Sequence, residues 1–268
     1  MPQQVARFRE LHREQTPLIL ANVWDAGGAR LVQSLGAMAV ATTSAGVAWS
    51  MGYQDGYLLP IETQVELTKR IARVLEIPLT VDVENGYSYD PLIVAENIVK
   101  IAKAGASGVN LEEGPDDPVV VISKIRATRA ALEKAGLDMF INLRCDVFLE
   151  KSVPADSMVA ETIKRGKAYQ ETGADGLFIP GLTKSEDIRA ITSASLMPVN
   201  VMSWPGVPTA DELAKLGVKR LSAGASVYQA LWKAMTDISI DFLKSGDSSL
   251  FMKGSMPYAE MQSMFSNI

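Results

Sequence analysis

The stretch LTVDVENGYSYDPLIVAENIVKIAKAGASGVNLE, residues 79–112, contains a strand, a helix and a second strand in succession. Residues 79–84 form a short, mostly apolar run that ends in acidic side chains. Residues 91–103 place apolar side chains at helical spacing behind a proline, and Gly105-Ala106 ends this helix before the apolar run at 108–112. Two buried strands joined by a helix predict a βαβ unit of a parallel sheet.

The same alternation recurs along the chain, and several helices end in a glycine followed by a small or branched residue, as at Gly36-Ala37 and Gly173-Ala174. The candidate strands are residues 18–24, 38–43, 79–84, 108–112, 140–146, 176–180, 199–203 and 220–223. The candidate helices include residues 62–75, 91–103, 118–134, 156–171 and 209–216. Repeated βα units without a long linker predict one α/β domain over residues 1–268, a (β/α)8 or TIM barrel. No G-x-G-x-x-G motif follows the first strand, which argues against a dinucleotide-binding sheet.

The composition excludes several classes of partner. The chain is 47% hydrophobic and 21% charged, with a net charge of −5. Because no cluster of Lys or Arg occurs, neither nucleic acid nor a membrane is the expected partner. The N-terminus is polar rather than a signal peptide, and no apolar run approaches the roughly 20 residues that span a bilayer. Cys145 is the only cysteine, so no internal disulfide can form, and we expect a cytoplasmic protein.

The segment from about residue 247 onward differs from the repeating units. It is rich in methionine and contains a predicted helix at 258–265. This tail either covers an apolar patch of its own barrel or contacts another subunit.

Acidic side chains gather at the predicted carboxyl ends of the strands, which is where barrels of this kind carry out chemistry. Asp82 and Glu84 are two residues apart, so they share a face and repel each other unless a cation or a proton lies between them. Glu112 ends the next strand in register, whereas Glu113 points to the opposite face. Oxygen ligands of this kind suit Mg²⁺ or Mn²⁺. The alternative is a carboxylate pair neutralised by Arg144 or by a lysine.

Other polar residues at the same edge are candidates for binding an acid. Arg144 could grip a substrate carboxylate with two hydrogen bonds, neutralise the acids, or do both. Asn200 could donate to a developing oxyanion or tie down a loop. Asp55 could contact the water shell of a metal or the substrate, or serve as a turn residue. The small residues after the second strand could cradle a carboxylate or phosphate with their backbone N–H groups: Thr42, Ser44, Ala45 and Gly46.

Two common catalytic arrangements are absent from the sequence. His12 is the only histidine and precedes the first strand, which excludes a Ser-His-Asp triad and a histidine-rich zinc site. Cys145 is out of phase with Arg144 along its strand, so we interpret it as a packing residue rather than a nucleophile.

Taken together, the strand ends resemble the isocitrate lyase/phosphoenolpyruvate mutase superfamily over most of residues 16–235. The resemblance implies a TIM barrel whose last helix is exchanged between the subunits of a dimer or tetramer. The matching segments are TTSAG (42–46), Asp55, VDVENGY (81–87), NLEEG (110–114), NLRCD (142–146), GADGLFIPG (173–181) and PVNV (198–201).

Enzymes of this superfamily bind Mg²⁺ and an α-oxo acid, and they stabilise an enolate while a C–C or P–C bond is broken or made. The resemblance implies that Asp82 binds the metal directly. The residues that hold the water molecules of the metal would be Asp55, Glu84 and Glu112. Those that contact the substrate would be Thr42, Ser44, Ala45, Gly46, Arg144 and Asn200. The expected catalytic residues are Arg144, Glu112 and Asp55.

The loop after the fourth strand departs from the superfamily. Its lyases carry a K-[KR]-C-G-H motif there, and its mutases carry a loop with lysine and asparagine. This chain has only Gly114-Pro115-Asp116-Asp117 before the next helix. In addition, Glu84 replaces the commoner aspartate, and Pro180 stands where the lyases have a glutamate. We therefore expect an open site without a lid.

An open site favours a Mg²⁺-dependent lyase for a small oxo- or hydroxy-dicarboxylate, with oxaloacetate decarboxylation as the simplest example. Decarboxylation needs a metal to hold the enolate and a proton that water can supply. Retro-aldol cleavage needs a positioned acid or base as well. The alternatives are a phosphonate-forming or phosphonate-cleaving enzyme and a catalytically inactive, metabolite-binding barrel.

Overall fold

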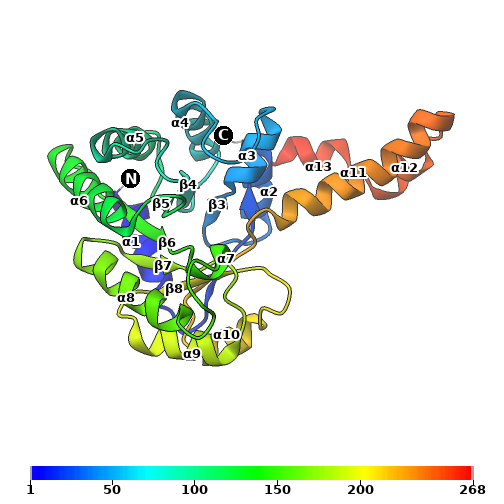
Figure 1. The fold of residues 1–268 in the computed structure, drawn as a ribbon. Helices are drawn as coiled ribbons and strands as arrows, with labels where there is room; N and C mark the ends of the chain where they lie inside the picture. Colours follow the sequence, from blue (N-terminus) through cyan, green and yellow to red (C-terminus); the bar gives the residue numbers. More distant parts are fainter. Residues whose placement is uncertain (1, 267–268) are drawn as a thin grey trace.

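A computed structural model describes residues 2–266, in which nine parallel strands alternate with helices (Figure 1). The strands are β1 (Leu18–Leu20), β2 (Asn22–Val23), β3 (Val40–Thr42), β4 (Leu79–Asp82), β5 (Gly108–Glu112), β6 (Phe140–Arg144), β7 (Gly176–Phe178), β8 (Val199–Met202) and β9 (Arg220–Ser222). Their order in the sheet is β1-β9-β8-β7-β6-β5-β4-β3-β2. Because Ala21 alone separates β1 from β2, the sheet closes into a TIM barrel, as the sequence predicted. The predicted first strand is split at Ala21, where its pairing changes from β9 to β3.

The helices lie between and after these strands. They are α1 (Pro2–Leu11), α2 (Ala26–Ser34), α3 (Ser44–Ser50), α4 (Ile61–Arg73), α5 (Pro91–Lys103), α6 (Pro118–Lys134), α7 (Val147–Glu150), α8 (Met158–Glu171), α9 (Ser185–Ala194), α10 (Ala210–Lys215), α11 (Ser226–Ser245), α12 (Ser249–Gly254) and α13 (Tyr258–Ser263). Helices α5 and α6, which follow two strands with acidic ends, begin alike. In each, an aspartate before a proline accepts a backbone N–H at 2.8 Å, Asp90 from Leu92 and Asp117 from Val119.

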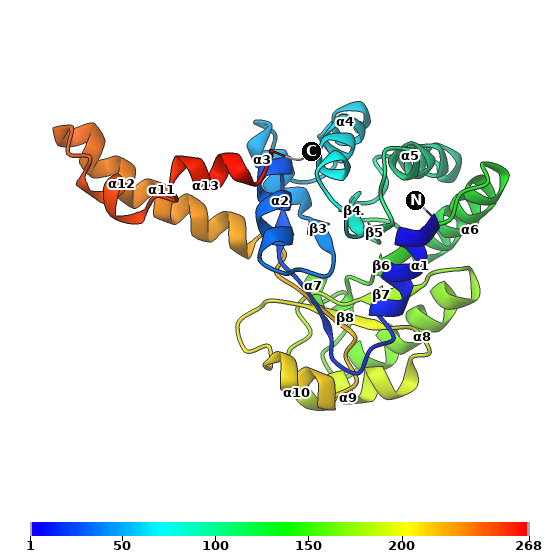
Figure 2. The same cartoon turned by 180° about the vertical axis from the view of Figure 1, so that it is seen from behind.

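Two apolar clusters hold the barrel together. The larger lies between the sheet and the helices and contains the outward-facing strand residues, such as Val81, Val109 and Ile141. The smaller fills the amino-terminal part of the barrel interior, where Phe8 of α1 packs against Phe140. Figure 2 shows α1 in front of β6 and β7. The barrel interior near the carboxyl ends of the strands is polar, and the candidate site lies there.

The C-terminal segment forms an arm that leaves the barrel (Figure 1). Helix α11 projects outward, and α13 runs back beside α2, where Arg30 Nε donates to the carbonyl of Met264 at 2.7 Å. Many apolar side chains of α11 are exposed, among them Trp232, Met235 and Leu243. None of the helices described is both long enough and apolar enough to cross a membrane.

His12, directly after α1, makes the stability of the fold sensitive to acid. Its ring is buried, stacks on Phe140, and bonds through Nδ1 to the carbonyl of Phe8 at 2.7 Å. Burial, together with repulsion by Arg220, lowers the pKa of His12 from 6.5 to about 3. The unfolded chain therefore takes up a proton below pH 6.5 that the folded protein excludes.

The contribution of neutral His12 to stability is full above pH 6.5 and is lost as the pH falls toward 3. Because this contribution is lost, we expect the free energy of unfolding to fall by about 2 kcal/mol between roughly pH 7 and pH 4.5. Urea unfolding at these two pH values would measure the effect. The decrease in the free energy of unfolding should be about 2 kcal/mol smaller for the variant His12→Phe than for the wild type. Equal losses in both proteins would contradict the prediction.

Candidate active site

The structure brings the predicted acids together at the carboxyl ends of the strands. Asp82 ends β4 and Glu112 ends β5, while Glu84 follows Asp82 by two residues. Asp55 reaches this carboxyl end of the barrel, the mouth, from the loop between α3 and α4. Burial is the main cause of the raised pKa values of Glu84 and Glu112, and the negative charges of Asp55 and Asp82 add to it at Glu84, as that of Asp82 does at Glu112. The four carboxylates thus form one electrostatic cluster.

Asp82 is buried and held from several directions. Its backbone N–H donates to Thr42 Oγ1 at 2.8 Å, so the Thr42 hydroxyl fixes β4 to β3. Its Oδ1 accepts from the N–H of Glu84 at 3.1 Å, and its Oδ2 accepts from Asn110 Nδ2 at 3.2 Å. Burial raises the pKa of Asp82, and the nearby Arg144 opposes that effect. Its carboxylate is therefore held in one orientation at the base of the mouth.

Glu84 and Glu112 are both shifted strongly toward the neutral form. Burial raises the pKa of Glu84 to about 7 and that of Glu112 to about 8, while Arg144 acts against the second shift. Glu84 also has a left-handed backbone, with φ of 51°. Residues other than glycine adopt this conformation only where the surroundings stabilise it, and such positions cluster at functional sites.

Tyr57, which no sequence pattern indicated, connects these two acids. Its backbone N–H donates to the Glu84 carboxylate, and its hydroxyl donates to Glu112 Oε1 at 2.8 Å. A Cβ atom on Gly114 would lie 2.3 Å from the Tyr57 hydroxyl, so this loop position requires glycine. Tyr57 thus contacts the acids from the loop between α3 and α4, and the mouth is less open on this side than the sequence indicated. Tyr57 lies in a connection, where strand alternation gives no signal.

The other side of the mouth has the short loop that the sequence predicted, because α6 begins at Pro118. Lys124 of α6 is fully buried and anchors this loop. Its Nζ pairs with Asp116 and donates to the carbonyl of Asn85 at 2.8 Å. The loop is therefore tied to the end of β4.

Arg144 ends β6, in register with Glu112 of β5. It forms an ion pair with Glu112, and its Nε donates to Asp146 Oδ1 at 2.6 Å. Glu113 points the other way, as predicted, and bonds to Tyr169 and Arg165 of α8. The arginine therefore neutralises acids at the mouth, which was one of its two predicted roles.

The remaining predicted substrate contacts differ in how free their side chains are. Burial raises the pKa of Asp55, and the nearby Ser44 hydroxyl opposes that shift. Ala45 and Gly46 are buried in the first turn of α3, and Gly46 lies close to Tyr228. The side chain of Asn200 has partners in the barrel interior on both its oxygen and its nitrogen.

The donor set of the mouth fits a hydrated divalent cation. Among residues 2–266, no group of three or more His, Cys, Asp or Glu side chains converges closely enough to hold an ion alone. Mg²⁺ usually binds through one or two carboxylates and keeps several waters. Burial, and after it the neighbouring carboxylates, raise the pKa values of Asp82, Glu84 and Glu112, so the ionised acids favour a nearby positive charge. A cation beside Asp82 would supply the missing positive charge.

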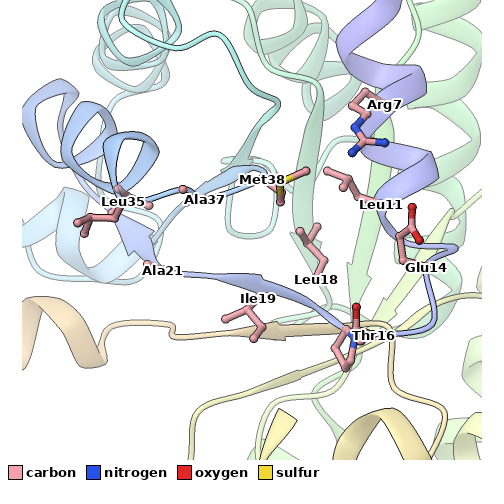
Figure 3. Close-up of a pocket in the computed structure, with 13 residues that line it drawn as sticks. Arg7, Leu11, Glu14, Thr16, Leu18, Ile19, Ala21, Leu35, Ala37 and Met38 are labelled. Atoms are coloured by element: carbon pink, nitrogen blue, oxygen red, sulfur yellow. The ribbon is translucent and has the colours of Figure 1, made fainter. Parts of the chain in front are cut away.

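A cavity of about 580 Å³ opens at the other end of the barrel (Figure 3). It lies between α1, β1 and the connection from α2 to β3, and it is lined by Leu11, Leu18, Ile19 and Met38 among others. Its walls are mostly apolar, and none of the predicted site residues reaches it. The acidic mouth is therefore the candidate active site.

A closed parallel barrel with acids and an arginine at its carboxyl end is the architecture of a TIM-barrel enzyme. The chain matches the phosphoenolpyruvate phosphomutase family over residues 8–243. It belongs to this family, within the isocitrate lyase/phosphoenolpyruvate mutase superfamily that the sequence motifs indicated.

Three comparisons show the range of proteins to which the chain is similar. An uncharacterised protein of Mycobacterium tuberculosis is 31% identical over 255 residues, covering 95% of this chain and 94% of that protein. The oxaloacetate decarboxylase of Paraburkholderia xenovorans is 26% identical over 266 residues, covering 94% of this chain and 86% of the enzyme. The crystal structure of a proposed phosphonomutase of Burkholderia cenocepacia is 43% identical, with a TM-score of 0.84, covering 88% of this chain and 99% of that one.

Proposed function

We propose that this chain is a Mg²⁺-dependent lyase that acts on a small α-oxo or hydroxy dicarboxylate through an enolate, with oxaloacetate decarboxylation as the simplest example. The observation that carries the proposal is the cluster of Asp55, Asp82, Glu84 and Glu112 beside Arg144. The short loop between β5 and α6 supports it, because that loop has neither a cysteine nor a lysine, and its two aspartates pair with Lys124 and cap α6 instead of being free as an acid or base for retro-aldol cleavage. The similarity to an oxaloacetate decarboxylase agrees with this choice.

In this proposal Asp82 would bind Mg²⁺, or Mn²⁺ in its place, and the other three carboxylates would hold the water molecules of the ion. A bound cation would polarise the oxo group and lower the free energy of the developing enolate. Arg144 would hold a substrate carboxylate through its guanidinium while it remains paired with Glu112 and Asp146. The backbone N–H groups of Ser44, Ala45 and Gly46 would hold the same or a second carboxylate.

The loop of residues 51–60 has a separate part in the proposal. Tyr57 would keep Glu84 and Glu112 in place and limit the access of bulk water to the mouth. The proton that completes decarboxylation would come from water. Thr42 and Asn200 are also predicted substrate contacts. Their side chains bond to other groups within the barrel, so a substrate would have to share these partners.

Metal removal tests the proposal directly. Pyruvate release from oxaloacetate would be followed with Mg²⁺, with EDTA, and with Mg²⁺ added back to the chelated protein. We expect EDTA to reduce the protein-dependent rate to background, and Mg²⁺ or Mn²⁺ to restore it. A blank with Mg²⁺ and no protein is required, because the ion alone promotes this reaction. A protein-dependent rate that is equal with and without metal would exclude the proposed mechanism.

A phosphonate-forming or phosphonate-cleaving enzyme is the second candidate, and the similarity to a proposed phosphonomutase favours it. Phosphorus NMR on phosphonopyruvate and phosphoenolpyruvate would distinguish the two reactions. A barrel that binds metabolites without turnover is the third candidate. Tight binding of oxalate with no turnover on a panel of C3–C6 oxo and hydroxy acids would favour it.

The proposal includes assembly into a homo-oligomer, a dimer or a tetramer. The exposed apolar side chains of α11, such as Trp232 and Met235, support it, because a second copy would remove them from water. Sedimentation of the purified protein would establish the number of subunits.

A further inference from the structure

A buried polar network lies in the barrel interior below Asp82. Asn142 of β6 donates from Nδ2 to Asn110 Oδ1 at 2.9 Å and to Asn200 Oδ1 at 3.0 Å. Arg220 of β9 donates from Nη2 to the same Asn110 oxygen at 3.2 Å. Each of these four side chains is at most 4% exposed. The network therefore places one positive charge inside the barrel.

The arginine determines which way the Asn110 amide points. An arginine side chain has only donors, so the atom of Asn110 that faces Arg220 must be the oxygen. The amide nitrogen of Asn110 then faces Asp82 and donates to its Oδ2 at 3.2 Å. In the flipped amide, N–H groups would face the guanidinium and an oxygen would face the carboxylate. Arg220 thus excludes the arrangement that would repel Asp82.

Burying the charged side chain of Arg220 is energetically unfavourable, and packing alone does not explain it. Its side chain is fully buried, and its Nε and Nη1 atoms have no hydrogen-bond partner among the residues described. Leaving buried donors without a partner is destabilising. The charge that favours the protonated guanidinium is that of Asp82, and burial opposes it by lowering the pKa of Arg220 to about 9. Both favourable interactions of Arg220, the hydrogen bond to Asn110 and the attraction to Asp82, are made at the base of the mouth.

We propose that Arg220 is a positioning residue of the active site: through Asn110 it holds the Asp82 carboxylate in the orientation that binds the divalent cation. This inference rests on the proposed role of Asp82 as a metal ligand. It adds Arg220 and Asn110, neither of which ligates the ion.

The proposal and a simple charge effect predict opposite changes in metal affinity when Arg220 is replaced. A buried positive charge repels a cation, so removing the charge alone would tighten metal binding. Removing the residue that orients Asp82 would weaken metal binding instead. Partners that orient a metal ligand typically change metal affinity 10- to 100-fold.

The test is the affinity for Mn²⁺, measured from the electron paramagnetic resonance signal of the free ion and independent of turnover. We expect Arg220→Met to bind Mn²⁺ at least about tenfold more weakly than the wild type. Arg220→Lys keeps the charge but replaces the planar fork with a flexible ammonium, and it should bind with intermediate affinity. Arg129→Met is the control, because Arg129 pairs with Asp175 away from the mouth, and it should bind as the wild type does.

A double-mutant cycle tests whether Arg220 acts through Asn110. Asn110→Leu should weaken Mn²⁺ binding, and adding Arg220→Met to it should weaken binding no further. Binding by Arg220→Met that is as tight as in the wild type, or tighter, would overturn the proposal, and so would additive losses. If Arg220→Met does not fold, Arg220→Lys decides, and wild-type affinity in that variant overturns the proposal.

Asp82→Ala separates failure of this inference from failure of the proposed function. If it binds Mn²⁺ as the wild type does, the metal role of Asp82 is wrong. If it loses binding while Arg220→Met retains it, only the role of Arg220 is wrong.

Discussion

Replacing Asp82 with alanine is expected to lower kcat/KM for the metal-dependent reaction by about 10³-fold, which corresponds to about 4 kcal/mol of lost transition-state stabilisation. The expectation follows from the position of the residue, since its carboxylate is fixed by Asn110, by Glu84 and through its own backbone by Thr42. Steady-state kinetics with saturating Mg²⁺ would measure the loss. Urea unfolding of the same variant would measure its stability, because the substitution leaves the N–H donors of Asn110 and Glu84 without their acceptor.

Asp175→Ala is the matched control for this variant. Asp175 is also an aspartate beside a strand, but it lies at the amino-terminal end of β7, where it bonds to Arg9 and Arg129. This variant should lose stability and keep its kcat/KM. An active Asp82→Ala protein, or an inactive but folded Asp175→Ala protein, would contradict the assignment of the mouth as the active site.

Replacing Arg144 with lysine is expected to raise KM for a dicarboxylate substrate and lower kcat/KM by about 100-fold. Lysine keeps the positive charge but cannot form two parallel hydrogen bonds to a carboxylate, a difference of about 3 kcal/mol at a buried charged contact. The loss should fall mainly on KM, because the contact exists before and during the reaction. Kinetics over a range of substrate concentrations would separate the two constants.

Arg165→Lys provides the comparison for Arg144→Lys. Arg165 pairs with Glu113, the neighbour of Glu112, but it does so on the outer side of the barrel against α8. Its replacement should leave KM unchanged. Similar effects of the two substitutions on KM would mean that Arg144 acts through the barrel structure rather than on the substrate.

The repeating pattern of strands, helices and glycine ends was sufficient to predict the parallel barrel. Alternation along β4 and β5 also predicted correctly that Asp82 and Glu112 point inward and that Glu113 points outward toward α8. These features depend on neighbours in the sequence, and a strand alternates its side chains wherever it lies. Strand register then followed from the requirement that one face of each strand meets the helices.

The sequence did not reveal the residues that complete the site from a distance. Tyr57 lies in a loop, and Arg220 begins a strand at the far side of the barrel, so no local period connects either residue to Asp82. Their roles depend on contacts between segments that are separated by tens of residues, or by more than a hundred for Arg220 and Asn110.

The sequence alone determined that the chain forms a TIM barrel with an acidic mouth and a short loop after the fourth strand. Local physics is enough for these features, since hydrophobic period, helix ends and side-chain alternation are properties of short segments. Only the tertiary structure determined that Tyr57 covers the acids and that a buried arginine orients Asn110 beneath Asp82. Those contacts exist because closing the barrel brings β9 across from β5, and no segment on its own carries that geometry.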